Sequence, residues 1–288
     1  MLHYNPGLVT TWVCAMSDSM EFLSKSKLDR LLNDFITRAS QTAHAGSPRL
    51  WIGGFPCGWV FPAAVQTLTD SSDVLLDDAG LHIGRGLPPG ETINALLATV
   101  AQKLRLAGQA PGWRNELLDV WCDNKRIGAI ERGVMRPLGL LTQAVHLNAW
   151  SEHGQLWVAR RALTKATDPG MWDTLVGGLV GQAEAADLAL VRESEEEAGL
   201  AEHQITQRTP LRKIAQMQRQ LREGYQIEDV LTSECVLPEG VIPQNQDGEV
   251  MEIVCLSPAE LVGMIQTGQF THEASIVILE DLRNRASS

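Results

Sequence analysis

Carboxylates, an arginine and a glycine fall at a fixed spacing between residues 178 and 197 of this 288-residue chain. A helix over residues 184–198 would place three of the carboxylates on one face, because positions three and four apart are neighbours on a helix. Oxygen ligands gathered in this way suit a hard divalent cation such as Mg²⁺ or Mn²⁺. The spacing therefore predicts a metal site. The residues that make up this spacing are Gly178, Glu184, Arg192, Glu193, Glu196 and Glu197.

The other residues of this stretch predict how the carboxylates are supported. Arg192 lies eight residues after Glu184 and four before Glu196, so its guanidinium can bind the helix to itself and orient the metal ligands. Gly177-Gly178 predicts a tight turn ahead of the helix, where a backbone carbonyl could also reach the metal. Gly199 fits the position just past a helix end.

The alternative interpretation is a solvated acidic helix face. On an exposed helix, like-charge pairs cost only about 0.2–0.5 kcal/mol each, so charge alone does not exclude it. In a partly buried cluster, the repulsion rises to roughly 4 kcal/mol for a pair 4 Å apart at an effective dielectric constant of about 20. A cation would then be needed to keep the cluster ionised. The joint fit of glycines, arginine and glutamates to one spacing favours the metal site.

This pattern resembles the Nudix box, the signature of hydrolases that cleave a diphosphate linked to another group. Ser194 departs from it, because the family usually has an aliphatic residue there. The resemblance implies metal binding by Glu193, Glu196, Glu197 and the backbone of Gly178, with Mg²⁺ or Mn²⁺ as the cofactor. Glu193, Glu196 and Glu249 are the implied catalytic residues. Many Nudix enzymes supply a further carboxylate after the box, and the alternative for Glu249 is a plain exposed glutamate.

A wider resemblance extends over residues 25–285. It rests on the order GWRNELLDV, IERGVMRPLG, AVHLNAW, RRALTKATDPGMWDTLVGG, the box, and NQDGEV. The chain is similar to Nudix proteins related to the thiamine-pyrophosphokinase-associated Nudix domain, which carry an N-terminal domain of their own. This implies an α/β (α+β) fold class, a Nudix α/β/α sandwich preceded by a small α+β domain. It also implies a small organic diphosphate as substrate, with thiamine diphosphate or its oxidised analogues cleaved to the monophosphate and phosphate.

Composition limits the partners. A net charge of −11 argues against nucleic acid, which normally requires a basic surface, and the apolar stretches are too short to cross a membrane. The odd number of scattered cysteines indicates reduced thiols in a cytoplasmic protein. We therefore expect a small-molecule diphosphate as the partner, with no nucleic acid and no membrane. The cysteines are Cys14, Cys57, Cys122, Cys235 and Cys255.

Apolar periodicity predicts two domains, 1–140 and 141–288, with residues 1–20 a loose extension in which Met16 and Met20 are alternative starts. In the first domain we expect helices from residue 26 and over 92–106, a strand, turn and short helix within 50–68, and two strands within 74–83. In the second we expect strands at 142–150, 155–160, 211–221 and 229–237 and helices at 257–266 and 273–285.

Several residues outside the box are candidates for substrate binding. Arg161 and Lys165 are predicted diphosphate clamps, the alternative being surface solubility. His146 would share a strand face with Asn148, and its alternative is a hydrogen-bonded structural histidine. Tyr225, followed by Gln226, could meet a substrate ring.

Three alternative functions remain at this stage. An ADP-ribose or nucleoside diphosphate-derivative hydrolase would share the reaction class. A non-catalytic module that binds a phosphorylated metabolite would be expected to have lost carboxylates, which are all present. Diphosphate isomerisation would need an added acid/base pair such as a cysteine and a glutamate, and the cysteines lie in no context that supports one.

Overall fold

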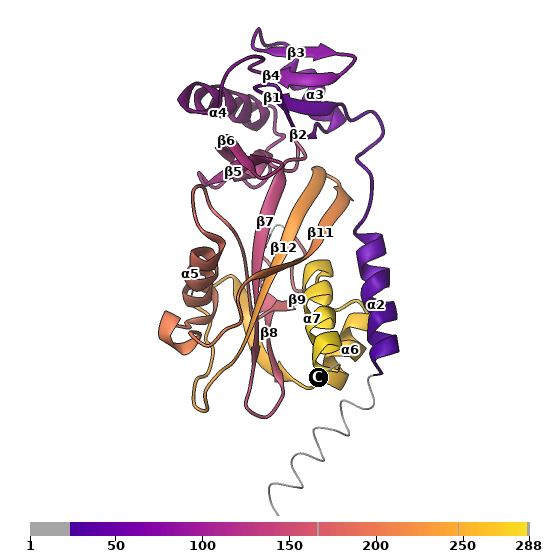
Figure 1. Ribbon diagram of the computed structural model, residues 1–288, viewed down its shortest axis with the longest axis vertical. Coiled ribbons are helices and arrows are strands. Elements are labelled where there is room, and N and C mark those ends of the chain that lie inside the picture. Colours follow the sequence, from indigo (N-terminus) through magenta and orange to yellow (C-terminus); the bar gives the residue numbers. More distant parts are fainter. Residues whose placement is uncertain (1–23, 166, 247, 287–288) are drawn as a thin grey trace, which may run out of the picture.

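The computed structural model describes residues 24–165, 167–246 and 248–286. Figure 1 shows two parts, a smaller one at the top that contains β1 to β6 and a larger one below it built around long strands. The expected loose extension over residues 1–20, with its cysteine and its two alternative starts, lies outside the described residues.

The smaller part combines a four-stranded sheet, ordered β2-β1-β4-β3 within the described residues, with helices and a hairpin. Two strands occupy residues 49–59, where one was expected, and the hairpin β5–β6 was not predicted. The elements are β1 (Arg49–Ile52), β2 (Phe55–Trp59), α3 (Pro62–Leu68), β3 (Val74–Asp77), β4 (Gly80–Ile83), α4 (Glu91–Leu106), β5 (Leu117–Cys122), β6 (Lys125–Glu131) and η1 (Arg132–Val134).

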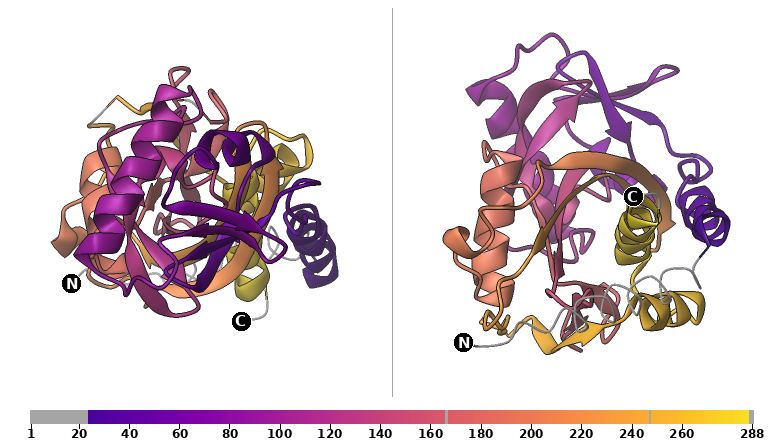
Figure 2. Two further views of the ribbon diagram at one scale, coloured as in Figure 1. Left: turned by 90° about the horizontal axis from the view of Figure 1, so that it is seen from above. Right: turned by 60° about the horizontal axis from the view of Figure 1, so that its bottom comes forward.

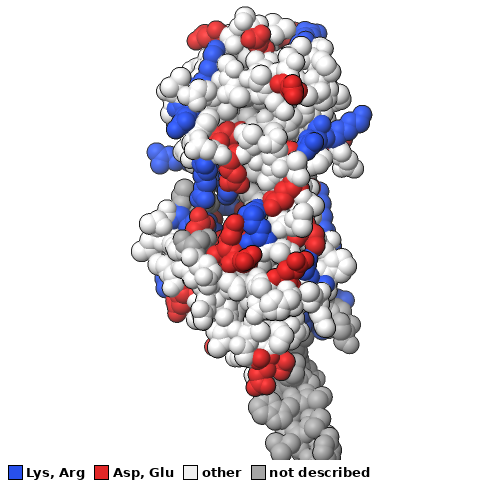
Figure 3. Space-filling view, turned by 90° about the vertical axis from the view of Figure 1, so that its left-hand side faces the viewer, with Lys and Arg blue, Asp and Glu red and all other residues white. Residues whose placement is uncertain are grey.

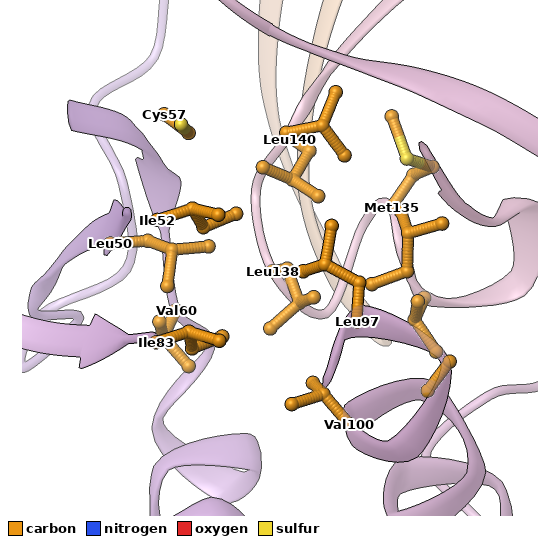
Figure 4. Packing of buried hydrophobic residues seen from close by; sticks show 14 of the residues in the cluster. Leu50, Ile52, Cys57, Val60, Ile83, Leu97, Val100, Met135, Leu138 and Leu140 are labelled. Atoms are coloured by element: carbon orange, nitrogen blue, oxygen red, sulfur yellow. The ribbon is translucent and has the colours of Figure 1, made fainter. Parts of the chain in front are cut away.

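An apolar core holds this part together. Leu50 and Ile83 from the sheet lie opposite Leu97 and Val100 from α4 (Figure 4). Leu138, from the segment that leads to the larger part, packs into the same cluster. Full burial of each such side chain contributes about 1.5–3 kcal/mol. The segment between the two parts is therefore anchored in the smaller core.

The larger part is a mixed sheet, with the order β11-β12-β7-β8-β13 across the described chain, while β10 pairs with β7 and β9 with β8. β7 and β12 are parallel, with Thr142 beside Glu228, and the other pairs are antiparallel. The strands are β7 (Leu141–Trp150), β8 (Leu156–Arg161), β9 (Trp172–Thr174), β10 (Val176–Leu179), β11 (Arg212–Leu221), β12 (Gly224–Val236) and β13 (Val250–Leu256).

Helices cover both faces of this sheet. One face packs against α5 (Ala186–Ala198), with η2 (Glu202–Gln204) just beyond it, and the other against α6 (Pro258–Gln266) and α7 (His272–Arg285) (Figure 2). This arrangement confirms the α/β/α sandwich with an α+β part ahead of it. Helix α6 begins with a capping box: the Ser257 hydroxyl accepts from the Glu260 backbone N–H, and the Glu260 carboxylate accepts from the Ser257 backbone N–H.

The first described helix belongs spatially to the larger part. α2 (Lys25–Arg38) presents Leu28, Leu32 and Phe35 to α7, at the spacing of one helix face (Figure 1). The chain that follows α2 pairs with the edge of β11, since Gln41 donates its backbone N–H to the carbonyl of Gln218. The boundary at residue 140 stays a prediction.

Two local expectations about the box are wrong. The helix begins at Ala186, so Glu184 lies in the turn before it. Gly177 and Gly178 lie in strand β10, rather than in a tight turn, and neither has a positive φ. Gly199 does end the helix in the left-handed conformation, with φ 63°.

Cys57, Cys122, Cys235 and Cys255 are free thiols. Among the described residues, no helix is both long enough and apolar enough to cross a membrane.

Candidate functional site

Helix α5 carries its carboxylates toward the glycines of β10. Its buried face includes Ala189, Leu190 and Ala198, which pack under the sheet and fix how the helix is turned. Small and aliphatic side chains here let the helix approach the sheet closely. The face bearing Glu193 and Glu197 is thereby directed at the backbone of β10.

The contact between α5 and β10 depends on glycine. The Glu197 Oε2 accepts the backbone N–H of Gly177 at 3.0 Å. A Cβ at Gly178 would overlap the carboxylate of Glu193. The two glycines therefore serve close approach of helix carboxylates to a strand, and not a turn.

Arg192 binds four groups around the site. Its Nε and Nη2 donate to the two carboxylate oxygens of Glu184 at 2.9 and 3.0 Å, a bidentate pair. Its Nη1 donates to Glu193 at 2.7 Å and to Glu196 at 3.1 Å, and its Nη2 reaches the carbonyl of Leu179. The bonds from Arg192 lower the pKa of Glu184. The orienting role of Arg192 stays a prediction.

Ser194 has a structural explanation. It is fully buried, and its hydroxyl donates to the carbonyl of Leu190 at 2.7 Å within the same helix. The hydroxyl is thus satisfied internally, so a serine fits where an aliphatic residue is usual.

Lys165 and Glu249 complete the cluster of charged side chains around Glu193 and Glu197. The Lys165 ammonium contacts Glu249 directly and lies 3.7 Å from the Glu197 Oε1. Arg114, from the smaller part, places its Nη1 3.3 Å from the Glu249 Oε1. Burial would raise the pKa of Glu249, but the bonds from Lys165 and Arg114 outweigh it and lower that pKa. Glu249 therefore lies beside the box in space, although it is far from it in sequence.

The cluster has the chemistry that a hard cation needs. Burial raises the pKa of Glu197 to about 8 and also raises that of Glu193, and the nearby Lys165 and Arg192 do not offset this effect. The donors are all oxygens, which suits Mg²⁺ or Mn²⁺. Within the described residues, no three His, Cys, Asp or Glu side chains converge as a ready-made metal site. Glu196 is about half exposed and turns to Arg192.

A pocket of about 580 Å³ opens beside this cluster, at the junction of the two parts. Lys and Arg side chains gather there with Asp and Glu across the waist of the molecule (Figure 3). Basic side chains reach the pocket from both parts, which favours an anionic ligand. Those that line it are Arg114, Arg132, Arg136, Arg161, Lys165 and Arg222.

The structure separates the four predicted substrate-binding residues into two groups. Arg161 and Lys165 line the pocket, and the Arg161 Nη1 is held by Asp173 at 2.9 Å. His146 is buried away from the lining, with its Nδ1 3.0 Å from the Thr174 hydroxyl, and burial lowers its pKa. Tyr225 also lies away from the lining, and its hydroxyl donates to a backbone carbonyl after α2.

Sequence reasoning missed several residues that line the pocket. Arg114, Arg132 and Arg136 come from the smaller part and from the segment that joins the parts. They lie in the stretches GWRNELLDV and IERGVMRPLG, which carried part of the wider resemblance, so a signal was available. Glu228 had no local signal, because its place in the pocket depends on the pairing of β12 with β7.

A mixed sheet between helices, with carboxylates of one helix against a glycine strand, defines a domain of the Nudix class. The comparison with family models agrees, because residues 140–276 match the model described as NUDIX domain. The chain therefore contains a Nudix domain, which follows the smaller part.

Relatives resemble more than this domain. An uncharacterized protein of Saccharomyces cerevisiae is 27% identical over 66% of this chain and 61% of its own length. Nudix hydrolase 24, chloroplastic, of Arabidopsis thaliana is 29% identical over 78% of this chain and 64% of its own. Nudix hydrolase 20, chloroplastic, of the same plant is 31% identical over 65% of this chain and 51% of its own. The chain thus spans between 51% and 64% of the length of these relatives.

Proposed function

We propose that this protein is a divalent-metal-dependent hydrolase of small organic diphosphates. The single observation that carries the proposal is the junction of an oxygen-ligand cluster with a basic pocket. Glu193 and Glu197 lie against β10, and Lys165 belongs both to that cluster and to the pocket lining. A diphosphate in the pocket would therefore meet the carboxylate cluster and the cationic side chains together.

The residues of the chain have distinct roles in this proposal. Glu193 and Glu197 would hold the cation, with the Gly178 backbone beside them and Glu196 in support. When bound, a divalent cation neutralises phosphate charge and favours activation of water. Glu193 or Glu249 accepts the proton of the attacking water. Arg192 is a positioning residue, because its bonds hold the ligands in place.

The cations of the pocket bind the phosphates. Arg114 and Lys165 lie at the Glu249 end, and Arg132 and Arg136 extend the basic lining. Guanidinium groups form paired, charge-assisted bonds with phosphate oxygens and stabilise the charge that develops in the transition state. The volume of the pocket suits a small organic diphosphate.

Within this class we propose thiamine diphosphate or its oxidised analogues as the substrate, with the monophosphate and phosphate as products. The wider resemblance supports that choice. ADP-ribose or another nucleoside diphosphate derivative is the second candidate. We also propose a cytoplasmic location, which the odd number of scattered cysteines supports.

The substitution Glu197→Gln tests the reaction. It removes a buried ligand charge but keeps the side-chain shape, so we expect kcat for phosphate release to fall at least about 100-fold with little change in Tm. The matched control is Glu195→Gln on the exposed face of the same helix, which should leave kcat unchanged. Phosphate and product mass are measured with Mg²⁺ and a panel of thiamine, nucleotide and isoprenoid diphosphates.

Two outcomes would contradict the proposal. Unchanged turnover in Glu197→Gln would remove that carboxylate from the mechanism. Tight binding of a diphosphate without any turnover in the wild type would instead indicate a module that senses a phosphorylated metabolite.

A further inference from the structure

The lining of the pocket has two regions. Basic side chains form its rim, and the buried side chains of Gln226 and Glu228 form what we call its floor. Glu228 lines it from β12 and is only 6% exposed. Its Oε2 accepts from the Thr142 hydroxyl at 2.7 Å, and its Oε1 accepts from the Gln226 Nε2 at 3.0 Å. Among the described residues, no Lys or Arg forms an ion pair with Glu228. A carboxyl group buried without a cation favours its protonated form, because burying an unpaired charge is costly.

Gln226 extends this acceptor-rich floor. Its Nε2 also donates to the Glu273 Oε1 at 2.8 Å, so both amide hydrogens are used on carboxylates. Its Oε1 is buried and has no partner in the part of the chain that the structure describes. Gln226 is 3% exposed and lines the pocket. A buried acceptor left unpaired is costly, and a donor on a ligand would remove that cost.

The charges of the floor reinforce this preference. Burial and the neighbouring Glu273 raise the pKa of Glu228 to about 8. Burial would also raise the pKa of Glu273, but the bond from Gln226 and the nearby positive side chains lower it. The two carboxyls therefore keep one proton and one negative charge between them at neutral pH. A hydrogen-bond donor or a positive group is favoured beside that charge.

The basic side chains at the rim of the pocket form ion pairs with carboxylates other than those of the floor. Arg136 pairs with Glu223 at 2.8 Å, Arg161 with Asp173, and Lys165 with Glu249. None of these pairs includes the floor carboxylates. The pocket therefore has a cationic region suited to phosphates and an acceptor region suited to the opposite end of an organic diphosphate.

We propose that Gln226 and Glu228 form a specificity subsite for an amino or ring N–H group on the organic moiety of the substrate. The inference rests on the proposed function for the placement of the phosphates. An N–H group would pair with the free Gln226 oxygen and with the Glu228 carboxyl group, which both belong to side chains that line the pocket. A hydrocarbon moiety would leave these buried acceptors unpaired, and such sites reject analogues that lack the donor.

The test compares ligands that carry N–H groups with ligands that contain no nitrogen. Thiamine diphosphate and ADP-ribose form the first set, and isopentenyl and geranyl diphosphates form the second. Dissociation constants are measured by calorimetry with Ca²⁺ in place of Mg²⁺, so that turnover is slow. The full chain is used as wild type, Glu228→Gln and Gln226→Met. The matched control is Glu234→Gln, which removes a carboxylate from the same strand beside Arg285, away from the pocket lining.

We expect the best nitrogen-bearing ligand to bind the wild type at least tenfold more tightly than either hydrocarbon diphosphate. Glu228→Gln and Gln226→Met should each reduce that ratio at least fivefold, and Glu234→Gln should preserve it. A ratio near one in the wild type, or a ratio kept by both floor variants, would overturn the subsite. Where one floor variant fails to fold, the wild-type ratio and the other variant decide.

The failure of this inference can be told apart from failure of the proposed function. Phosphate release with Mg²⁺ is measured on the same ligands. Turnover without any preference for nitrogen-bearing ligands would refute the subsite alone. A tenfold binding preference without turnover of any ligand would refute the hydrolase and retain the subsite.

Discussion

The contacts that single side chains of the Nudix box make were predictable, because their partners are close in sequence. The bond between Arg192 and Glu184 spans eight residues, and that between Arg192 and Glu196 spans four. Helical spacing determines the contact with Glu196, while the contact with Glu184 also depends on the turn that precedes the helix. The pair of Lys165 with Glu249 spans 84 residues, and it depends on how β8 and β13 are paired. No local pattern specifies that contact, so the sequence supplied the residues but not their pairing.

The floor of the pocket predicts how stability depends on pH. Glu228 keeps its proton up to about pH 8 in the folded protein, while the unfolded chain releases it near 4.5. The folded state therefore binds more protons between these values, and the free energy of unfolding falls as pH rises through them. The groups that face Glu228 are Thr142, Gln226, Glu273 and Arg136. The lowered pKa of Glu273 acts below this window.

The substitution Glu228→Gln removes the titrating group, so we expect its stability curve to be flatter. The wild type should lose at least about 1 kcal/mol relative to the variant between pH 5 and pH 8, since one pKa unit corresponds to about 1.4 kcal/mol. Urea unfolding at several pH values measures both curves. Parallel curves would show that Glu228 is ionised in the folded protein at neutral pH.

At the scale of elements, hydrophobic periodicity located most helices and strands but not their neighbours. α4 and α7 lie within one residue of the expected starts. The glycines of β10 were expected in a turn, because glycine pairs often mark turns. Their actual role depends on the packing of α5 onto β10, which is a tertiary contact. The same limit applies to α2, whose apolar face was predicted while its partner α7, more than 230 residues away, was not.

The close approach of α5 to β10 predicts the effect of a single methyl group. In Gly178→Ala, the new Cβ would collide with the Glu193 carboxylate, so the helix or the carboxylate must move. We expect kcat to fall at least tenfold and stability to fall by about 1–3 kcal/mol, the usual cost of overpacking. Gly263→Ala is the control, because its Cβ would enter open space in α6. That change should raise the free energy of unfolding by about 0.5–1 kcal/mol and leave kcat unaltered. Equal behaviour of the two variants would refute the role assigned to Gly178.

At the scale of the whole molecule, the two parts meet at the pocket and share its charges. The Nudix model covers residues 140–276, yet Arg114 and Arg132 come from before that range. Composition gave only a net negative charge, which hides a local basic lining. The charge of a site depends on which side chains the fold brings together, and that information is absent from a sum over the chain.

This shared pocket predicts that the smaller part contributes to substrate affinity. Arg132 lines the pocket, is partly exposed and is held by Glu116 at 2.9 Å. In Arg132→Ala a phosphate would lose a charge-assisted bond, so we expect KM to rise about tenfold, equivalent to about 1.4 kcal/mol, with Tm nearly unchanged. Arg126→Ala is the matched control, since Arg126 is exposed on β6 and lies 3.7 Å from Asp119, outside the pocket lining. Steady-state kinetics measure both. If KM responds equally to the two changes, the effect is one of net charge, and the smaller part does not bind substrate through Arg132.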